Sequence, residues 1–253
     1  MDPMKRYAPL AVVMTAALAL SACQKQADAE FGAKVRAYLL EHPEVLEEMA
    51  LKLREKQTLA AAKASAATVN KYRQQLERDP RDVVINPNGE FTVVEFFDYR
   101  CGYCKVVAPE MVKLMQENPD VRFVFKEFPI FGEVSETAAR IALTAEGKTK
   151  GLQLYKAWME DRGLDEAALD RHLIEVGLDP AAVRKAAASP AITEQLNDIR
   201  TLAQALGLQG TPAFIIGDYV IPGADLDAVK AALAKVKGQN LKRPPATAPG
   251  SPT

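Results

Sequence analysis

Two histidines and three cysteines stand in 253 residues, and this scarcity limits the metal chemistry open to the chain. A structural zinc site needs about four ligands, usually from a second Cys-x-x-Cys or a nearby pair of histidines. His42 and His172 are isolated in the sequence, and both are interpreted as surface or packing residues. We therefore expect no metal centre and no cofactor.

The chain also lacks an excess of charge of either sign. Its 32 basic and 33 acidic residues leave a net charge of −1. A balance near zero gives no reason to expect nucleic-acid binding. The length suits one or two domains with a hydrophobic core.

The N-terminal segment lacks an apolar run of about 20 residues, the length that crosses a bilayer. It has two basic residues near its start, an apolar run from Tyr7 to Leu20, and the ending "LSAC" at Cys23. This pattern indicates a secretory signal over residues 1–22. The ending resembles the lipobox of bacterial lipoproteins, which are cut before a cysteine that then carries lipid. The alternative is a simple secreted protein with an incidental Cys23.

Export would place the remaining cysteines in an oxidising compartment, where disulfides form and persist. Gln24 stands where enterobacterial lipoproteins of the inner membrane carry aspartate, so it favours the outer membrane. We expect the periplasmic side of a bacterial membrane, with a lipid anchor at Cys23.

Hydrophobic spacing predicts a helical arm from about Ala29 to Asp79, with Leu46, Met49 and Leu53 on one face. The arm has few residues to bury a core alone, so it packs either on the main domain or on another copy of itself. After it, "FTVVEFF" and "VRFVFKEFPI" predict strands, residues 135–206 predict helices throughout, and "TPAFIIGDYVIPG" returns to strand.

Cys101 and Cys104 form a Cys-Gly-Tyr-Cys motif between a predicted strand and a predicted helix. A disulfide across two residues closes too small a loop to act mainly as a staple. At a helix start, the dipole and the free N–H groups stabilise a thiolate, which is the species that attacks disulfides. Arg100 and Lys105 can add positive charge. Cys101 is therefore the expected nucleophile, and Cys104 the residue that resolves the mixed disulfide.

The segment "VVEFFDYRCGYCK" resembles the active-site segment of thioredoxin-fold disulfide oxidoreductases of the DsbA kind. "GTPAFIIG", about 110 residues later, resembles their cis-proline loop, and the similarity covers roughly Val83 to Lys237. The arm is similar to that of suppressor-of-copper-sensitivity C proteins and related outer-membrane-associated proteins. The resemblance implies an α/β thioredoxin fold with an inserted all-helical domain, preceded by an N-terminal helical arm.

The expected organisation follows from this resemblance. Its segments are 1–22, signal peptide; 23–79, lipid site and helical arm; 83–134, first part of the thioredoxin fold; 135–206, helical insertion; 207–238, second part with the cis-proline loop; and 239–253, disordered tail.

The resemblance also assigns roles to individual residues. Pro212 is expected beside the cysteines, with the backbone of Thr211 pairing with bound substrate. Glu95, six residues before Cys101, takes the place of the family's buried acid. An apolar strand should raise its pKa, which suits it to relay a proton for the resolving thiol. Lys126 is the candidate partner of Glu95 in this relay, and the alternative is a structural Glu95–Lys126 ion pair.

These observations predict an exported thiol:disulfide oxidoreductase that acts on protein disulfides and leans to isomerase or reductase. In some proteins of the subgroup the arm oligomerises the chain, which places several sites around a shared cavity. Expected partners are protein substrates with cysteines, an unidentified membrane redox partner and another copy of the chain. Gly102-Tyr103 lacks the histidine of the family's strongly oxidising founder, which argues against very strong oxidant character.

Two alternatives stay open at this point. One is a monomeric dithiol oxidase. The other is a copper(I)-binding chaperone that uses the same two thiolates, since soft thiolates suit Cu(I). Met111 and Met115, four apart on the predicted helix, are expected in the core and not as copper ligands.

The lipid anchor is directly testable. Cys23→Ser should release the protein from membranes and abolish palmitate labelling, because no other residue of the lipobox can carry the lipid. Membrane fractionation and labelling of both chains measure this, and unchanged results for the variant would reject the anchor.

Overall fold

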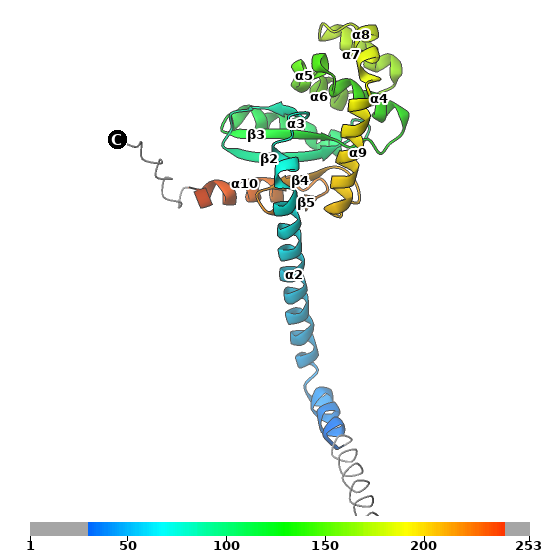
Figure 1. Cartoon of the computed structure of the whole chain (residues 1–253). Coiled ribbons are helices and arrows are strands. Elements are labelled where there is room, and N and C mark those ends of the chain that lie inside the picture. Colours follow the sequence, from blue (N-terminus) through cyan, green and yellow to red (C-terminus); the bar gives the residue numbers. More distant parts are fainter. Residues whose placement is uncertain (1–29, 241–253) are drawn as a thin grey trace, which may run out of the picture. The chain divides into compact units, whose positions relative to one another are not determined.

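A computed structural model describes residues 30–240 of the chain, which divides into two compact units with a boundary between Ala60 and Ala61 (Figure 1). The expected signal segment, Cys23 and residues 241–253 lie outside the described residues. Within residues 30–240, no helix has both the length and the apolar character needed to span a bilayer.

The first unit is helical and exposes its apolar side chains. Residues 30–41 form a helix, and α2 (Glu44–Glu77) begins after the break at Pro43. Leu46, Met49 and Leu53 are 54, 60 and 56% exposed, respectively. Residues 30–60 thus present a row of apolar side chains to solvent.

The second unit is built on a five-stranded sheet with the strand order β1-β3-β2-β4-β5. In its centre, β2 (Phe91–Phe97) pairs in parallel with β3 (Val121–Glu127) and antiparallel with β4 (Ala213–Ile216). The edges are β1 (Val83–Ile85) and β5 (Tyr219–Pro222), both antiparallel to their neighbours. Four of these strands were predicted. The three residues of β1 are too few to show the alternation that identifies a strand in sequence.

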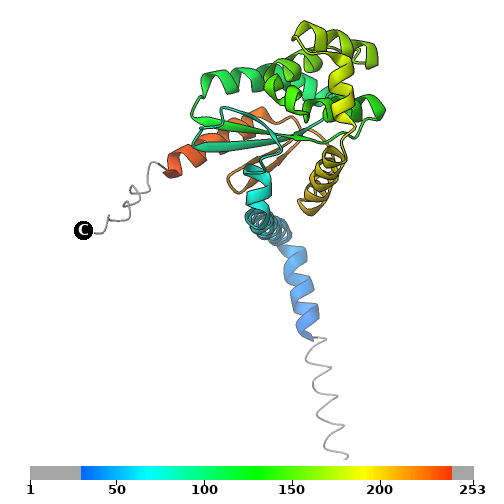
Figure 2. The same cartoon turned by 45° about the horizontal axis from the view of Figure 1, so that its top comes forward.

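Helices cover this sheet. Most of the inserted helices lie together over one part of it, whereas the last one, Pro190–Ala205, extends to its other face (Figure 2). Asp179 caps α8 (Pro180–Ala187), with Pro180 in its first turn. The helices of the second unit that follow β2 are α3 (Gly102–Glu117), α4 (Glu133–Ala142), α5 (Ala145–Thr149), α6 (Gly151–Glu160), α7 (Glu166–Glu175), α8 (Pro180–Ala187), α9 (Pro190–Ala205) and α10 (Leu226–Asn240). The last of these extends two residues into the expected tail, 239–253.

Alternation along the strands sends side chains into two separate cores. Val93 and Phe97 lie in a core with residues of α3, α4, α6, α7, α8, α10 and the N-terminal part of α9. On the other face, Val94 lies in a core with α9 and the C-terminal part of α2, where Val69 and Leu76 are 0 and 1% exposed. Residues 61–77 of α2 are therefore part of the folded unit, because their apolar residues meet the sheet.

Candidate active site

The two described cysteines lie where β2 gives way to α3. Cys101 is the N-cap of α3 and has an extended backbone, with φ −69° and ψ 119°. Its sulfur accepts a hydrogen bond from the backbone N–H of Cys104 at 3.4 Å. Both cysteines are free thiols, 2 and 0% exposed. The first sulfur thus occupies the end of a helix where unpaired N–H groups and the dipole favour a negative charge.

The pKa values of the two thiols are shifted in opposite directions. The pKa of Cys101 is lowered from 9.0 to about 6, mainly by a hydrogen bond from the Cys104 side chain, which together with backbone N–H groups outweighs burial. Burial raises the pKa of Cys104 far above its usual value, and the hydrogen bond to Cys101 adds to this. At neutral pH the first is a thiolate and the second stays a thiol, which matches the expected division of nucleophile and resolving residue.

The loop before β4 closes over the nucleophile. The Thr211–Pro212 peptide bond is cis, as the resemblance implies. The Cys101 sulfur lies 3.2 Å from the Thr211 carbonyl oxygen, to which it donates a hydrogen bond while it is protonated. The loop before β4 therefore contacts the Cys101 sulfur, although Thr211 and Cys101 are 110 residues apart in the sequence.

Asp98, which the sequence reasoning missed, ties the loops around the cysteines together. Its Oδ1 accepts hydrogen bonds from the Arg100 N–H at 2.6 Å and from the Ser135 hydroxyl at 2.8 Å. Its Oδ2 accepts from the N–H groups of Ile130 and Phe131 at 2.7 and 3.0 Å. An aspartate after a strand is a common turn signal, but it does not indicate which distant loop it binds.

Glu95 lies buried on the same face of the sheet as the cysteines, 1% exposed. The Tyr155 hydroxyl donates to its two carboxyl oxygens at 3.1 and 3.2 Å. Burial raises the pKa of Glu95 to about 8, although the hydrogen bond from Tyr155 lowers it. Its charge in turn raises the pKa of Cys104, so the two groups interact. Tyr155 comes from α6, and no signal in the sequence connects it with Glu95.

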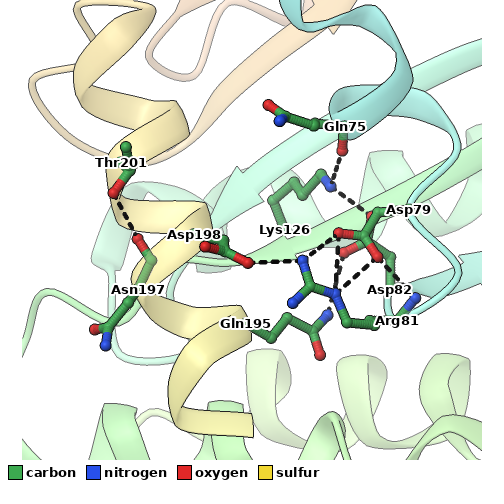
Figure 3. Close-up of polar contacts among 9 residues, drawn as sticks. All are labelled: Gln75, Asp79, Arg81, Asp82, Lys126, Gln195, Asn197, Asp198 and Thr201. Atoms are coloured by element: carbon green, nitrogen blue, oxygen red, sulfur yellow. Dashed lines mark hydrogen bonds and ion pairs between the residues drawn. The ribbon is translucent and has the colours of Figure 1, made fainter. Parts of the chain in front are cut away.

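The predicted Glu95–Lys126 pair is wrong, both as a relay and as a structural ion pair. In the register of the sheet Glu95 stands beside Phe125, whereas Lys126 stands beside Phe96, so the two side chains leave on opposite faces. The Lys126 ammonium donates to Asp82 and to the Gln75 carbonyl (Figure 3).

Arg100 and Lys105 are held in place by backbone carbonyls. Arg100 donates to the Phe131 carbonyl at 3.2 Å. Lys105 donates to the carbonyls of Trp158 and Asp161, both at 2.7 Å. Both cations therefore fasten neighbouring chain segments to the start of α3.

Residues 30–240 contain no group of three or more His, Cys, Asp or Glu placed to hold a metal ion. Met111 and Met115 lie in the core at 0 and 2% exposure, as predicted. His42 contacts Glu44, and His172 contacts Asp161 and Glu175.

Comparison with known families gives the class of protein. Residues 92–234 match the family described as "DSBA-like thioredoxin domain", and residues 28–60 match "Copper resistance protein ScsC N-terminal domain". The chain belongs to the DsbA-like thioredoxin-domain family. It is a thiol:disulfide oxidoreductase of the DsbA/ScsC kind, with the arm-bearing organisation of ScsC.

Three similar proteins illustrate the relationship. BcfH of Salmonella enterica Typhimurium is 32% identical with a TM-score of 0.66, over 87% of this chain and 100% of that one. Proteus mirabilis ScsC in a transitional conformation is 28% identical with a TM-score of 0.61, over 84% of this chain and 95% of that one. The thiol:disulfide interchange protein DsbA of Bordetella pertussis is 27% identical over 63% of this chain and 81% of its own length.

The acidity of Cys101 should depend on the donor that Cys104 supplies. In the wild type, the rate of iodoacetamide alkylation of Cys101 should rise through pH about 6. Cys104→Ala removes the hydrogen bond and should move this inflection upward, toward the ordinary cysteine pKa of 9.0. Cys104→Ser keeps a donor and should move it less. Inflections that coincide in all three proteins would show that Cys104 does not set the pKa.

Proposed function

We propose that the chain reshuffles and reduces disulfides of exported proteins, with Cys101 as nucleophile and Cys104 as resolving residue. The observation that carries this proposal is the opposite acidity of the two thiols at the start of α3, beside the cis-proline loop. Cys101, a thiolate at neutral pH, can attack a disulfide, whereas the buried thiol of Cys104 cannot attack until it is deprotonated.

The reaction then takes two exchanges. The Cys101 thiolate attacks one sulfur of a substrate disulfide, that bond breaks, and the second substrate sulfur leaves as a thiolate. In isomerisation this thiolate attacks another disulfide of the substrate and that bond breaks. The thiolate released there attacks the mixed disulfide, forms a new substrate disulfide and displaces Cys101 as a thiolate. In reduction Cys104 loses its proton and attacks the Cys101 sulfur, which forms the Cys101–Cys104 disulfide and releases the substrate cysteine as a thiolate. We propose that the backbone of Thr211, whose carbonyl lies beside the Cys101 sulfur, pairs with the bound substrate segment.

Glu95 is proposed to accept the proton of Cys104 in the second exchange. Its pKa of about 8 lies close to neutral, so it can both accept and return a proton under physiological conditions. No cation is needed for this role. Tyr155 holds the carboxyl in place, so it is a positioning residue.

Glu95→Gln should slow the release of the mixed disulfide at least about tenfold while leaving the alkylation rate of Cys101 unchanged. The wild-type release rate should rise through pH about 8, and the variant should lose this dependence.

The stability of the two proteins should differ as well. Between pH 4.5 and about 8, Glu95 keeps its proton in the folded protein but is ionised in the unfolded chain. Wild-type stability should therefore fall as the pH rises from 4.5 to about 8. That of Glu95→Gln should fall less, because only the raised pKa values of Asp82 and Glu127 still contribute. Single-turnover kinetics and denaturant unfolding measure both.

Lys126→Met is the matched control, because it removes a buried charge from the opposite face of the sheet. It should leave the release rate unchanged and lower the free energy of unfolding by roughly 3–5 kcal/mol, since it leaves Asp82 buried without its cation. A slowed release in Lys126→Met would return that lysine to the relay, and a normal rate in Glu95→Gln would remove Glu95 from it.

The arm supports isomerisation over simple oxidation. Its apolar row at Leu46, Met49 and Leu53 is exposed in the single chain, and residues 28–60 match the ScsC N-terminal domain. We infer that these rows meet between chains, so that several Cys101 sites act on one substrate. A Salmonella relative is described as a periplasmic thioredoxin-like protein, which supports the periplasm as the compartment, and the lipid anchor at Cys23 stays a prediction.

Removing residues 1–60 should give a monomer that exchanges small disulfides normally but loses roughly tenfold or more in refolding scrambled ribonuclease. The cut belongs before Ala61 because a later one would strip Val69 and Leu76 from the core. Sedimentation and the refolding assay measure both properties.

Substituting Leu46, Met49 and Leu53 by Gln in the complete chain should reproduce this loss without shortening the arm. A wild-type chain that sediments as a monomer at tens of micromolar would overturn the isomerase assignment and favour an oxidase.

A further inference from the structure

A groove runs beside the active site, between α3 and α6. Its volume is about 780 Å³, and its lining includes Gly102, the residue after the nucleophile. Neither Thr211 nor Pro212 lines it, so it is separate from the position where the substrate backbone is proposed to pair. A substrate chain joined to Cys101 can therefore extend over the groove with residues that flank its cysteine.

The groove has an apolar floor and a positive rim. Its apolar lining consists of Val106, which is 72% exposed, buried Met159, and the α3 residues Ala108, Pro109 and Val112. Four cations line it, namely Arg100, Lys105, Lys156 and Arg162, against the single carboxylate of Glu160.

This positive charge is only partly offset within the protein, where Asp161 and Asp98 attract Lys105. Arg100 and Lys105 donate to backbone carbonyls, which hold the two groups in place but carry no net charge. Lys156 and Arg162 are exposed, and in the part of the chain that the structure describes neither forms an ion pair. A groove of one sign next to a reactive group attracts segments of the opposite sign and speeds their association.

We propose that this groove binds the acidic, partly apolar segment that flanks the reactive cysteine of a protein substrate. Its apolar floor binds aliphatic or aromatic side chains of the substrate segment, and the cations at its rim bind Asp and Glu side chains of the same segment. The groove would thus select among substrate disulfides before exchange begins. This inference rests on the proposed function, because it requires Cys101 to be the atom that joins the substrate.

Two peptide disulfides test the selection. They carry the same cysteine and the same apolar residues, and differ only in flanking Glu or Lys. With the complete chain, kcat/KM should be about fivefold higher for the Glu peptide, an effect of the size expected for exposed charge pairs. The preference should shrink in about 0.5 M salt, because screening weakens contacts between exposed charges.

Lys156→Gln/Arg162→Gln should abolish the preference. Lys113→Gln/Lys185→Gln is the matched control, since it removes the same charge from exposed positions outside the groove lining. This control should keep the preference. Equal loss in both double variants would assign the effect to overall charge, and equal rates for both peptides in the wild type would reject the groove as a selective site.

An uncharged small disulfide, hydroxyethyl disulfide, separates this inference from the proposed function. The wild type and the two double variants should reduce it at the same rate, because it does not reach the cations at the rim of the groove. A wild type that fails to react with it would overturn the proposed exchange chemistry. A normal rate with no discrimination between peptides would overturn the groove alone.

Discussion

The chemistry of this protein depends on the junction at which β2 ends and α3 begins. Cys101 has the extended backbone of an N-cap, so its sulfur receives the N–H of Cys104 and lies at the positive end of a helix. Asp98 holds this junction through hydrogen bonds from both flanking loops. The low pKa of Cys101, the buried position of Cys104 and the contact with Thr211 all follow from this arrangement.

The sheet keeps the buried acid apart from the buried cation. Glu95 shares its core with the cysteines and Tyr155, whereas Lys126 and Asp82 pair on the other face. A lysine beside Glu95 would favour its ionised form and lower its pKa. With only a tyrosine as hydrogen-bond partner, the carboxyl retains a pKa of about 8, which suits proton exchange with a thiol.

One helix serves both units. The C-terminal part of α2 completes the second core through Val69 and Leu76, and its Gln75 carbonyl accepts a hydrogen bond from Lys126. The N-terminal part of α2 instead exposes its apolar residues. The same helical spacing thus places apolar residues in a core in one stretch and exposes them in the other.

Local sequence determined the α/β pattern, the helical insertion, the Cys-x-x-Cys at a helix start and the loop before Pro212, because spacing and turn residues act over a few positions. Tertiary structure alone decided which side chains meet. The register between β2 and β3 separated Lys126 from Glu95, and α6 brought Tyr155 to Glu95 from 60 residues away. Periodicity shows that a face of a helix or strand is apolar, but the partner that covers this face is chosen only when distant segments pack together.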